Sequence, residues 1–145
     1  MKSRCLFVTV FSLSLAINIF ASDNKNRDNT YPSELLKTWK LVVFVNETAN
    51  IHKRPDWQEN DRYTITFHEN GRISGRTFSN KLFGEYVVDK NTFSFTEIGS
   101  TRVTEIYDGP MYMDALRTVR SYSLLNGELK LYYDYGKYML FVELE

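Results

Sequence analysis

The stretch Asn70-Gly71-Arg72-Ile73-Ser74-Gly75, followed by Gly84-Glu85-Tyr86-Val87-Val88, is the most informative part of this chain for its fold. Apolar and polar residues alternate beside each glycine, and an Asn-Gly pair accepts the positive φ angles of a tight hairpin turn. A second such pair, Asn126-Gly127, follows later in the chain. The pattern is typical of consecutive antiparallel strands and predicts a sheet that is closed or strongly curved.

On both sides of this stretch the pattern continues, and we predict roughly eight strands in hairpin order. The alternating apolar runs lie at residues 39–45, 62–68, 72–75, 82–88, 93–95, 102–106, 122–124, 129–133 and 138–142. Residues 33–36 predict a brief helical turn. The polar stretch 46–60 contains Pro55 and predicts a long loop.

One helix interrupts the strand pattern late in the chain. Asp108-Gly109-Pro110 is typical of a helix start, with a capping acid and a proline in the first turn. Four apolar residues then follow at helical spacing, namely Tyr112, Ala115, Leu116 and Val119. We therefore predict a single-domain, β-rich α+β fold, an antiparallel barrel or strongly curved sheet whose late helix covers an open side. A helix-free sandwich is the alternative.

The N-terminus predicts export. Lys2 and Arg4 precede an uncharged run at residues 5–20, and the small residue Ala21 precedes a polar stretch. These are the parts of a secretory signal peptide. We predict a signal peptide at residues 1–21, a disordered leader at 22–34 and one folded domain at 35–145. The alternative is an uncleaved anchor, but the apolar run is shorter than the ~20 residues that span a bilayer.

Cleavage after Ala21 would change the cysteine content and the net charge of the exported chain. Cys5 is the single cysteine and lies at the start of the apolar run, whereas a lipoprotein needs a cysteine at the end of that run. The exported chain would therefore contain no disulfide and no transmembrane anchor. It would also lose Lys2 and Arg4, leaving 16 basic against 18 acidic residues and a formal net charge of −2. That charge argues against nucleic-acid binding and against a polybasic membrane patch.

Residues 36–141 resemble the META domain family. The resemblance rests on the order of Trp39-Lys40-Leu41, the Asn70 to Gly75 stretch, Asn80 before Gly84-Glu85-Tyr86, and Thr101-Arg102 before the helix. It implies a compact β-rich domain with one helix, in the periplasm or elsewhere in a bacterial envelope. It implies no enzymatic activity.

The chain departs from the META pattern at two positions. Members of the family commonly carry a cysteine where this chain has Ser79, and a second one near the position of Glu105. If those cysteines pair in relatives, this chain lacks a cross-link that is worth about 2–5 kcal/mol in small secreted domains.

Asn80, Thr101 and Arg102 are the candidate site residues, because they match the family pattern. In the functional interpretation they form a polar patch for a ligand or partner, with Arg102 holding a carboxylate or phosphate. In the structural interpretation Asn80 holds a turn, Thr101 satisfies a sheet edge and Arg102 is a surface cation. We favour the structural interpretation.

A second candidate is the tyrosine-rich final hairpin, which contains Tyr132, Tyr133, Tyr135 and Tyr138. Exposed tyrosines anchor protein interfaces at low entropic cost. Aromatic pairs across neighbouring strands also stabilise a sheet without any binding role. Alternation along the strands predicts that some of these rings face inward and others face solvent.

The sequence predicts no catalytic centre, metal site or cofactor. His52 and His68 are the only histidines and have no ligand-spaced partners, and no serine lies in a nucleophile context. We expect a non-enzymatic module that binds another envelope or secreted protein. The alternative is a carrier that holds a small apolar, lipid-like ligand inside the barrel. The oligomeric state stays open.

Overall fold

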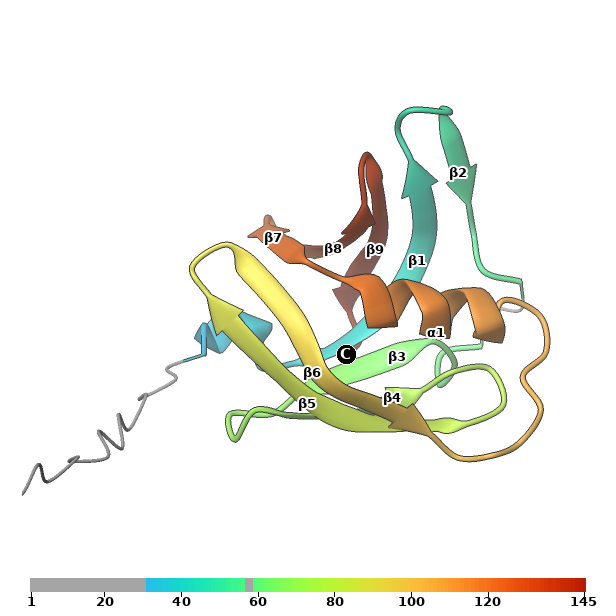
Figure 1. The fold of residues 1–145 in the computed structure, drawn as a ribbon, viewed down its shortest axis with the longest axis horizontal. Coiled ribbons are helices and arrows are strands. Elements are labelled where there is room, and N and C mark those ends of the chain that lie inside the picture. Colours follow the sequence, from blue (N-terminus) through green and yellow to red (C-terminus); the bar gives the residue numbers. More distant parts are fainter. Residues whose placement is uncertain (1–30, 57–58) are drawn as a thin grey trace, which may run out of the picture.

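The computed structural model describes residues 31–56 and 59–145. Nine strands form one antiparallel sheet in the order β2-β1-β3-β4-β5-β6-β7-β8-β9, and β1 also pairs with β9 (Figure 1). The elements are the 3₁₀ turn η1 (Ser33–Leu35), the helix α1 (Gly109–Thr118) and the strands β1 (Thr38–Asn46), β2 (Ile51–Lys53), β3 (Thr64–Phe67), β4 (Arg72–Arg76), β5 (Lys81–Asp89), β6 (Thr92–Ser100), β7 (Ser121–Leu125), β8 (Glu128–Asp134) and β9 (Lys137–Glu143).

The sheet closes on itself through β1 and remains open at one place. The long strand β1 pairs along its length with β9 and, at its first residues, with β3. Between β6 and β7 the pairing consists of one residue pair, Thr92 with Ser121. The helix α1 lies across this opening (Figure 1) and contacts β6 and β8. The predicted curved sheet with a late helix over its open side is confirmed.

The helix buries the face that its spacing predicted. Tyr112, Ala115, Leu116 and the following Val119 are all buried in the core. Pro110 lies in the first turn, as expected. Within the part of the chain that the structure describes, no helix is long and apolar enough to cross a membrane.

The interior of the sheet is filled by aliphatic and aromatic side chains. The ring of Phe67 packs edge-on against Tyr86 and Phe93, with centroid distances of 4.9 and 5.7 Å. Tyr63 packs edge-on against Tyr112 of the helix at 5.7 Å. Edge-to-face packing at these distances is a favourable arrangement of aromatic quadrupoles. The barrel interior is therefore a packed core.

Packing of the domain begins slightly before the predicted boundary. The predicted signal peptide at 1–21 and residues 22–30 of the predicted leader lie outside the described residues. Tyr31, within the predicted leader, packs on Tyr86 with a centroid distance of 4.6 Å. The predicted helical turn is confirmed as η1, which ends where the Leu35 carbonyl accepts a hydrogen bond from Trp39 Nε1 at 2.9 Å.

Two predicted elements are wrong. The predicted loop at 46–60 contains β2, because residues 51–53 fold back and pair with the end of β1. The predicted strand at 102–106 is irregular, and the preceding strand β6 instead runs without interruption to Ser100. After Thr101, whose N–H still bonds to Lys81 O, the buried side chain of Asn80 takes over the backbone groups of Val103. The hydrogen bonds of the Asn80 side chain therefore replace the strand pairing that the apolar alternation predicted at residues 102–106.

Leu116 of α1 is fully buried where the helix packs over the opening. Shortening its side chain would leave a cavity and should destabilise the domain. We expect Leu116→Ala to lower the free energy of unfolding by about 2–5 kcal/mol, measured by urea denaturation. Leu125→Ala, at a side chain that is 69% exposed, is the control and should change it by less than about 0.5 kcal/mol. Equal effects of the two substitutions would contradict the packing of α1 over the sheet.

The buried tyrosines predict a loss of stability at alkaline pH. Burial raises the pKa of the Tyr63 hydroxyl from its ordinary 10 to about 12, and burial also raises the pKa of Tyr112. In the unfolded chain these hydroxyls ionise at a lower pH than in the folded domain. The free energy of unfolding is therefore fully retained below pH 10 and falls as the pH rises toward 12. Urea denaturation across this range, with tyrosinate absorbance, tests it. In Tyr112→Phe the free energy of unfolding should decrease less between pH 10 and 12 than in the wild type. The same pH dependence in both proteins would contradict the role of the buried hydroxyl.

Candidate functional site

Asn80 is a buried clamp that holds two loops together. Its side chain is 1% exposed. Its Oδ1 accepts hydrogen bonds from Val103 N and Thr101 Oγ1, both at 2.8 Å. Its Nδ2 donates to Val103 O at 2.7 Å and to Glu105 Oε1 at 2.6 Å. The buried amide thus holds the loop between β6 and α1 against the domain.

Thr101 belongs to this clamp and Arg102 does not. Lys81 N donates to Thr101 Oγ1 at 3.1 Å, so the threonine joins the end of β5 to the loop. The side chain of Arg102 is exposed and makes no hydrogen bond or ion pair with the described residues. The structure therefore brings Asn80 and Thr101 together as neighbours, and it places Arg102 on the outside of the same loop.

Glu105 completes the clamp at the place where this chain departs from the family's cysteines. Its carboxylate accepts hydrogen bonds from Thr77 Oγ1, from Asn80 Nδ2 and, at 3.3 Å, from Ser79 N. The side chain also packs over Gly109, where a Cβ atom would collide with Glu105 Oε2. The positions of Ser79 and Glu105 are thus joined by hydrogen bonds to one carboxylate.

Asp108 has a different role from the predicted helix cap. Its side chain makes no capping bond to α1. Both carboxylate oxygens instead accept from Lys53 Nζ at 2.6 Å, and Oδ2 also accepts from Asp56 N at 2.6 Å. A charged ammonium and a nearby backbone donor satisfy this buried carboxylate, so it ties β2 and the following loop to the start of the helix.

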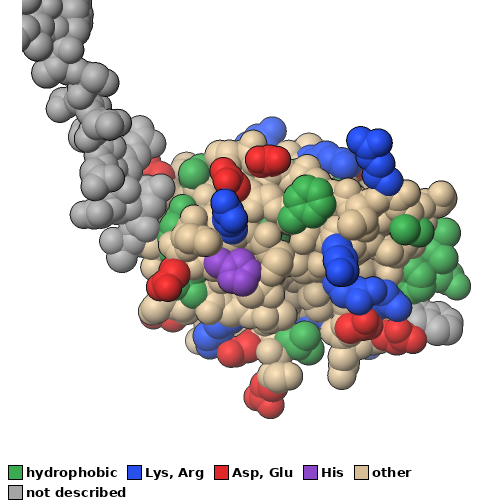
Figure 2. Space-filling view, turned by 90° about the horizontal axis from the view of Figure 1, so that it is seen from below, with side chains coloured by type: hydrophobic (Ala, Val, Ile, Leu, Met, Phe, Trp, Pro, Cys, Tyr) green, Lys and Arg blue, Asp and Glu red, His purple; other side chains and the backbone are tan. Residues whose placement is uncertain are grey.

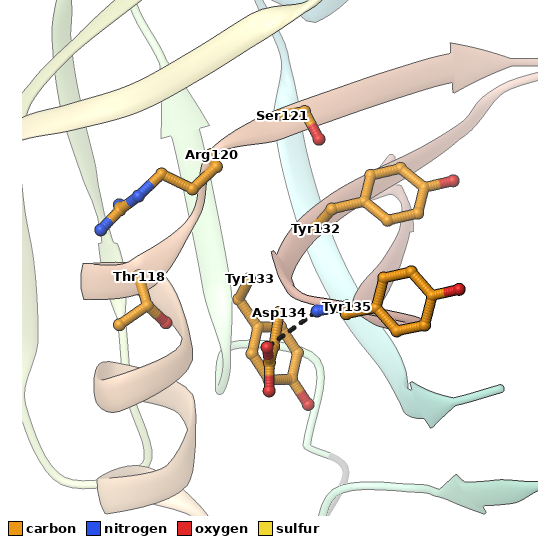
Figure 3. Close-up of a pocket in the computed structure, with 7 residues that line it drawn as sticks. All are labelled: Thr118, Arg120, Ser121, Tyr132, Tyr133, Asp134 and Tyr135. Atoms are coloured by element: carbon orange, nitrogen blue, oxygen red, sulfur yellow. Dashed lines mark hydrogen bonds between the residues drawn. The ribbon is translucent and has the colours of Figure 1, made fainter. Parts of the chain in front are cut away.

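A surface groove lies between the end of α1 and the β8–β9 hairpin (Figure 3). We call it the tyrosine groove. Its volume is about 620 Å³, and it is lined by Thr118, Arg120, Ser121, Tyr132, Tyr133, Asp134 and Tyr135. The rings of Tyr132 and Tyr135 point the same way, away from α1, whereas Thr118 and Arg120 form the opposite side (Figure 3). The groove therefore has tyrosine residues on its hairpin side and polar residues on its α1 side.

Two further hollows share lining residues with the tyrosine groove. One, of about 530 Å³, runs along α1 past Met111 and Ala115 and shares Thr118 and Tyr133 with it. The other, of about 480 Å³, lies against Glu47, Thr48 and Gly136 and shares Tyr132 and Tyr135. The three hollows are therefore neighbours on the surface beside α1 and the β8–β9 hairpin.

Hydrogen bonds and a ring contact hold the hairpin that carries the tyrosines. The Asp134 carboxylate accepts from Lys137 Nζ at 2.7 Å and from Tyr135 N at 2.8 Å, and the bond from Lys137 holds the pKa of Asp134 below its usual range. Tyr135 itself is 89% exposed. The rings of Tyr132 and Tyr138 pack across β8 and β9 at 5.3 Å. The hairpin thus uses some rings for packing and presents one to solvent.

The sequence singled out the tyrosines of this groove but missed its other wall. Thr118, Arg120 and Ser121 lie at and after the end of α1, where they have no distinctive motif. Arg120 is exposed, and its Nη1 donates to Val119 O at 2.9 Å. Among the described residues it forms no ion pair. Only the closure of the sheet brings this stretch opposite the final hairpin.

Comparison with known proteins assigns the family. The model of the META domain matches residues 33–145, which is most of the chain. This chain belongs to the META domain family. The match begins at the first residue of η1 and includes the clamp and the tyrosine groove. A search of curated proteins found no match.

Two solved structures share the fold of this META domain. A DUF4847 family protein from Bacteroides vulgatus is 18% identical, with a TM-score of 0.57 over 76% of this chain and 94% of its own. A protein from Burkholderia xenovorans, solved by NMR, is 18% identical, with a TM-score of 0.60 over 95% of this chain and 98% of its own. At this identity the likeness concerns the fold alone.

The clamp predicts that substitution of Asn80 is costly and that substitution of Arg102 is not. Asn80→Ala leaves Val103 N–H, Val103 C=O and Thr101 Oγ1 without their partner, and we expect it to lower the free energy of unfolding by about 2–3 kcal/mol. Arg102→Ala removes an exposed side chain and should change it by less than about 0.5 kcal/mol. Chemical denaturation of the two variants checks this, and a comparable loss in Arg102→Ala would refute the outward placement of Arg102.

Proposed function

We propose that this META domain is a non-enzymatic binding module of the bacterial envelope, and that the tyrosine groove binds a segment of another envelope or secreted protein. The observation that carries the proposal is the side chain of Tyr135, which is 89% exposed beside a groove of about 620 Å³. A large ring exposed to solvent on a hydrogen-bonded hairpin has a hydrophobic cost that binding would remove.

The groove has the composition of a protein-binding surface. Tyrosine and arginine are among the residues most enriched at positions that dominate binding energy, because they offer large contact area with few rotatable bonds or several donors. Tyr132, Tyr135 and Arg120 provide both kinds on opposite walls. Arg120 has no carboxylate partner among the described residues, so an acidic side chain in the bound segment would supply one.

The packed interior supports this proposal over a ligand carrier. A carrier needs an enclosed apolar cavity, whereas the core here is occupied by Trp39, Phe67, Phe93 and Phe141, each nearly or fully buried. The tyrosine groove and its two neighbouring hollows all lie at the surface. Export through a signal peptide at residues 1–21 would bring the groove to its proposed partners in the envelope.

The experiment first identifies the partner and then measures its affinity. A photoreactive aromatic residue placed at Tyr135 would cross-link the partner in intact cells, and mass spectrometry would identify it. With the purified partner, Tyr135→Ala should weaken binding at least ten-fold, because truncation of an interface tyrosine commonly costs about 1.4 kcal/mol or more.

The matched control is Phe83→Ala, which removes an exposed ring on β5, outside the tyrosine groove. It should leave the affinity unchanged. Equal affinities of wild type and Tyr135→Ala would refute the groove as the binding site. Native mass spectrometry that detects a lipid bound inside the domain would favour the carrier instead.

A further inference from the structure

The loop from Thr101 to Tyr107, which joins β6 to α1, exposes three apolar side chains together with polar ones. Its apolar side chains face solvent: Val103 is 61% exposed, Ile106 48% and Tyr107 53%. Three large apolar residues within five positions form a concentrated patch, whereas single exposed apolar residues are common on any protein surface. We call this loop the apolar tip.

Glu105 in the loop and Asp108 at the start of the helix have their carboxylates turned inward. The Glu105 carboxylate is engaged by Thr77, Ser79 and Asn80, and the Asp108 carboxylate by Lys53 and Asp56 N. Both negative charges are thereby held by donors within the protein. The outer surface of the tip is left without an exposed carboxylate of its own.

The cations of the region face outward. Arg102 is exposed and forms no ion pair with the described residues, and Lys81 is exposed at the adjoining end of β5. The other two arginines nearby are matched, Arg62 by Glu59 and Asp61, and Arg76 by Asp61. Arg102 and Lys81 are therefore the cations beside the apolar side chains that form no ion pair among the described residues.

Side-chain contacts hold the tip, which lies at an end of the domain. Asn80 bonds to both backbone groups of Val103, and Tyr107 packs edge-on against Phe78 with a centroid distance of 4.6 Å. The loop forms the outer end of the domain beyond β4 and α1 (Figure 1). Hydrophobic side chains gather at one end of the face shown in Figure 2, next to basic and acidic ones. Because the loop is already ordered, presenting its apolar residues costs little ordering entropy on binding.

We propose that the apolar tip docks on an anionic lipid surface. A protruding tip with Val, Ile and Tyr side chains can enter the interfacial region of a bilayer, where tyrosine is favoured and apolar area leaves water. Arg102 and Lys81 then lie at the level of the headgroups and attract their negative charge. The inward carboxylates avoid the repulsion that exposed ones would cause. This surface is separate from the tyrosine groove, and neither proposal requires the other.

The test is co-sedimentation of the purified domain with vesicles. Vesicles of phosphatidylcholine containing phosphatidylglycerol should bind it, and vesicles of phosphatidylcholine alone should bind it at least ten-fold more weakly. The double variant V103S/I106S should lose more than ten-fold in affinity for the anionic vesicles. Arg102→Gln should lose about five-fold, which corresponds to about 1 kcal/mol per basic residue near the surface. Added salt should weaken binding of the wild type.

Two control variants show whether vesicle binding depends on the apolar tip in particular. Leu125→Ser removes an apolar side chain that is 69% exposed at the β7–β8 turn and should bind vesicles like the wild type. Tyr135→Ala should also bind normally, because it alters only the groove. All variants should unfold at the wild-type denaturant concentration.

Three results would overturn the proposal. These are absence of wild-type binding to anionic vesicles, equal binding to both vesicle types, and a V103S/I106S variant that binds as Leu125→Ser does. Gel filtration in which wild type self-associates and V103S/I106S does not, together with no vesicle binding, would make the tip a protein interface instead.

Discussion

The seam between β6 and β7 governs the architecture of this domain. Thr92 and Ser121 form the one bridge there, so the curved sheet does not close by strand pairing alone. The backbone edges and the aromatic interior must be covered by another element, and α1 covers them with Tyr112, Ala115 and Leu116. The loop that enters this helix forms the apolar tip, and the chain that leaves it forms one wall of the tyrosine groove. Both candidate surfaces are thus consequences of the same opening.

The second organising feature is the polar clamp around Asn80. Resemblance to the META family implied a missing cysteine pair at Ser79 and near Glu105. In this chain the Glu105 carboxylate bonds to Ser79 N, Thr77 Oγ1 and Asn80 Nδ2 at that place. Hydrogen bonds of this kind stabilise only while every buried group has a partner, so the clamp depends on all its members at once. It also explains why two of the three family-matched residues are structural while the third, Arg102, faces outward.

The two proposed functions depend on different interactions at two separate surfaces. The tyrosine groove combines aromatic area with an arginine that has no carboxylate partner among the described residues, which suits a chain segment with its own shape and charges. The apolar tip combines exposed apolar side chains with neighbouring cations, which suits a broad anionic surface that has no specific contour. A protein held at a membrane by one end would leave its groove free for a partner, since the groove lies at the opposite end of α1 from the tip (Figure 1).

Local patterns in the sequence determined most of the strands, both Asn-Gly turns, the buried face of α1 and the family. Each depends on residues close in the chain, whose alternation or helical spacing survives in any tertiary context. Tertiary structure alone decided the pairing of β2 with β1, the irregular path of residues 101–107, the role of Asp108 and the far wall of the groove. In each of these a side chain or backbone group meets a partner far along the chain, as Asn80 meets Val103 and Lys53 meets Asp108. Such contacts have no local signature, because they depend on how the closed sheet brings distant segments together.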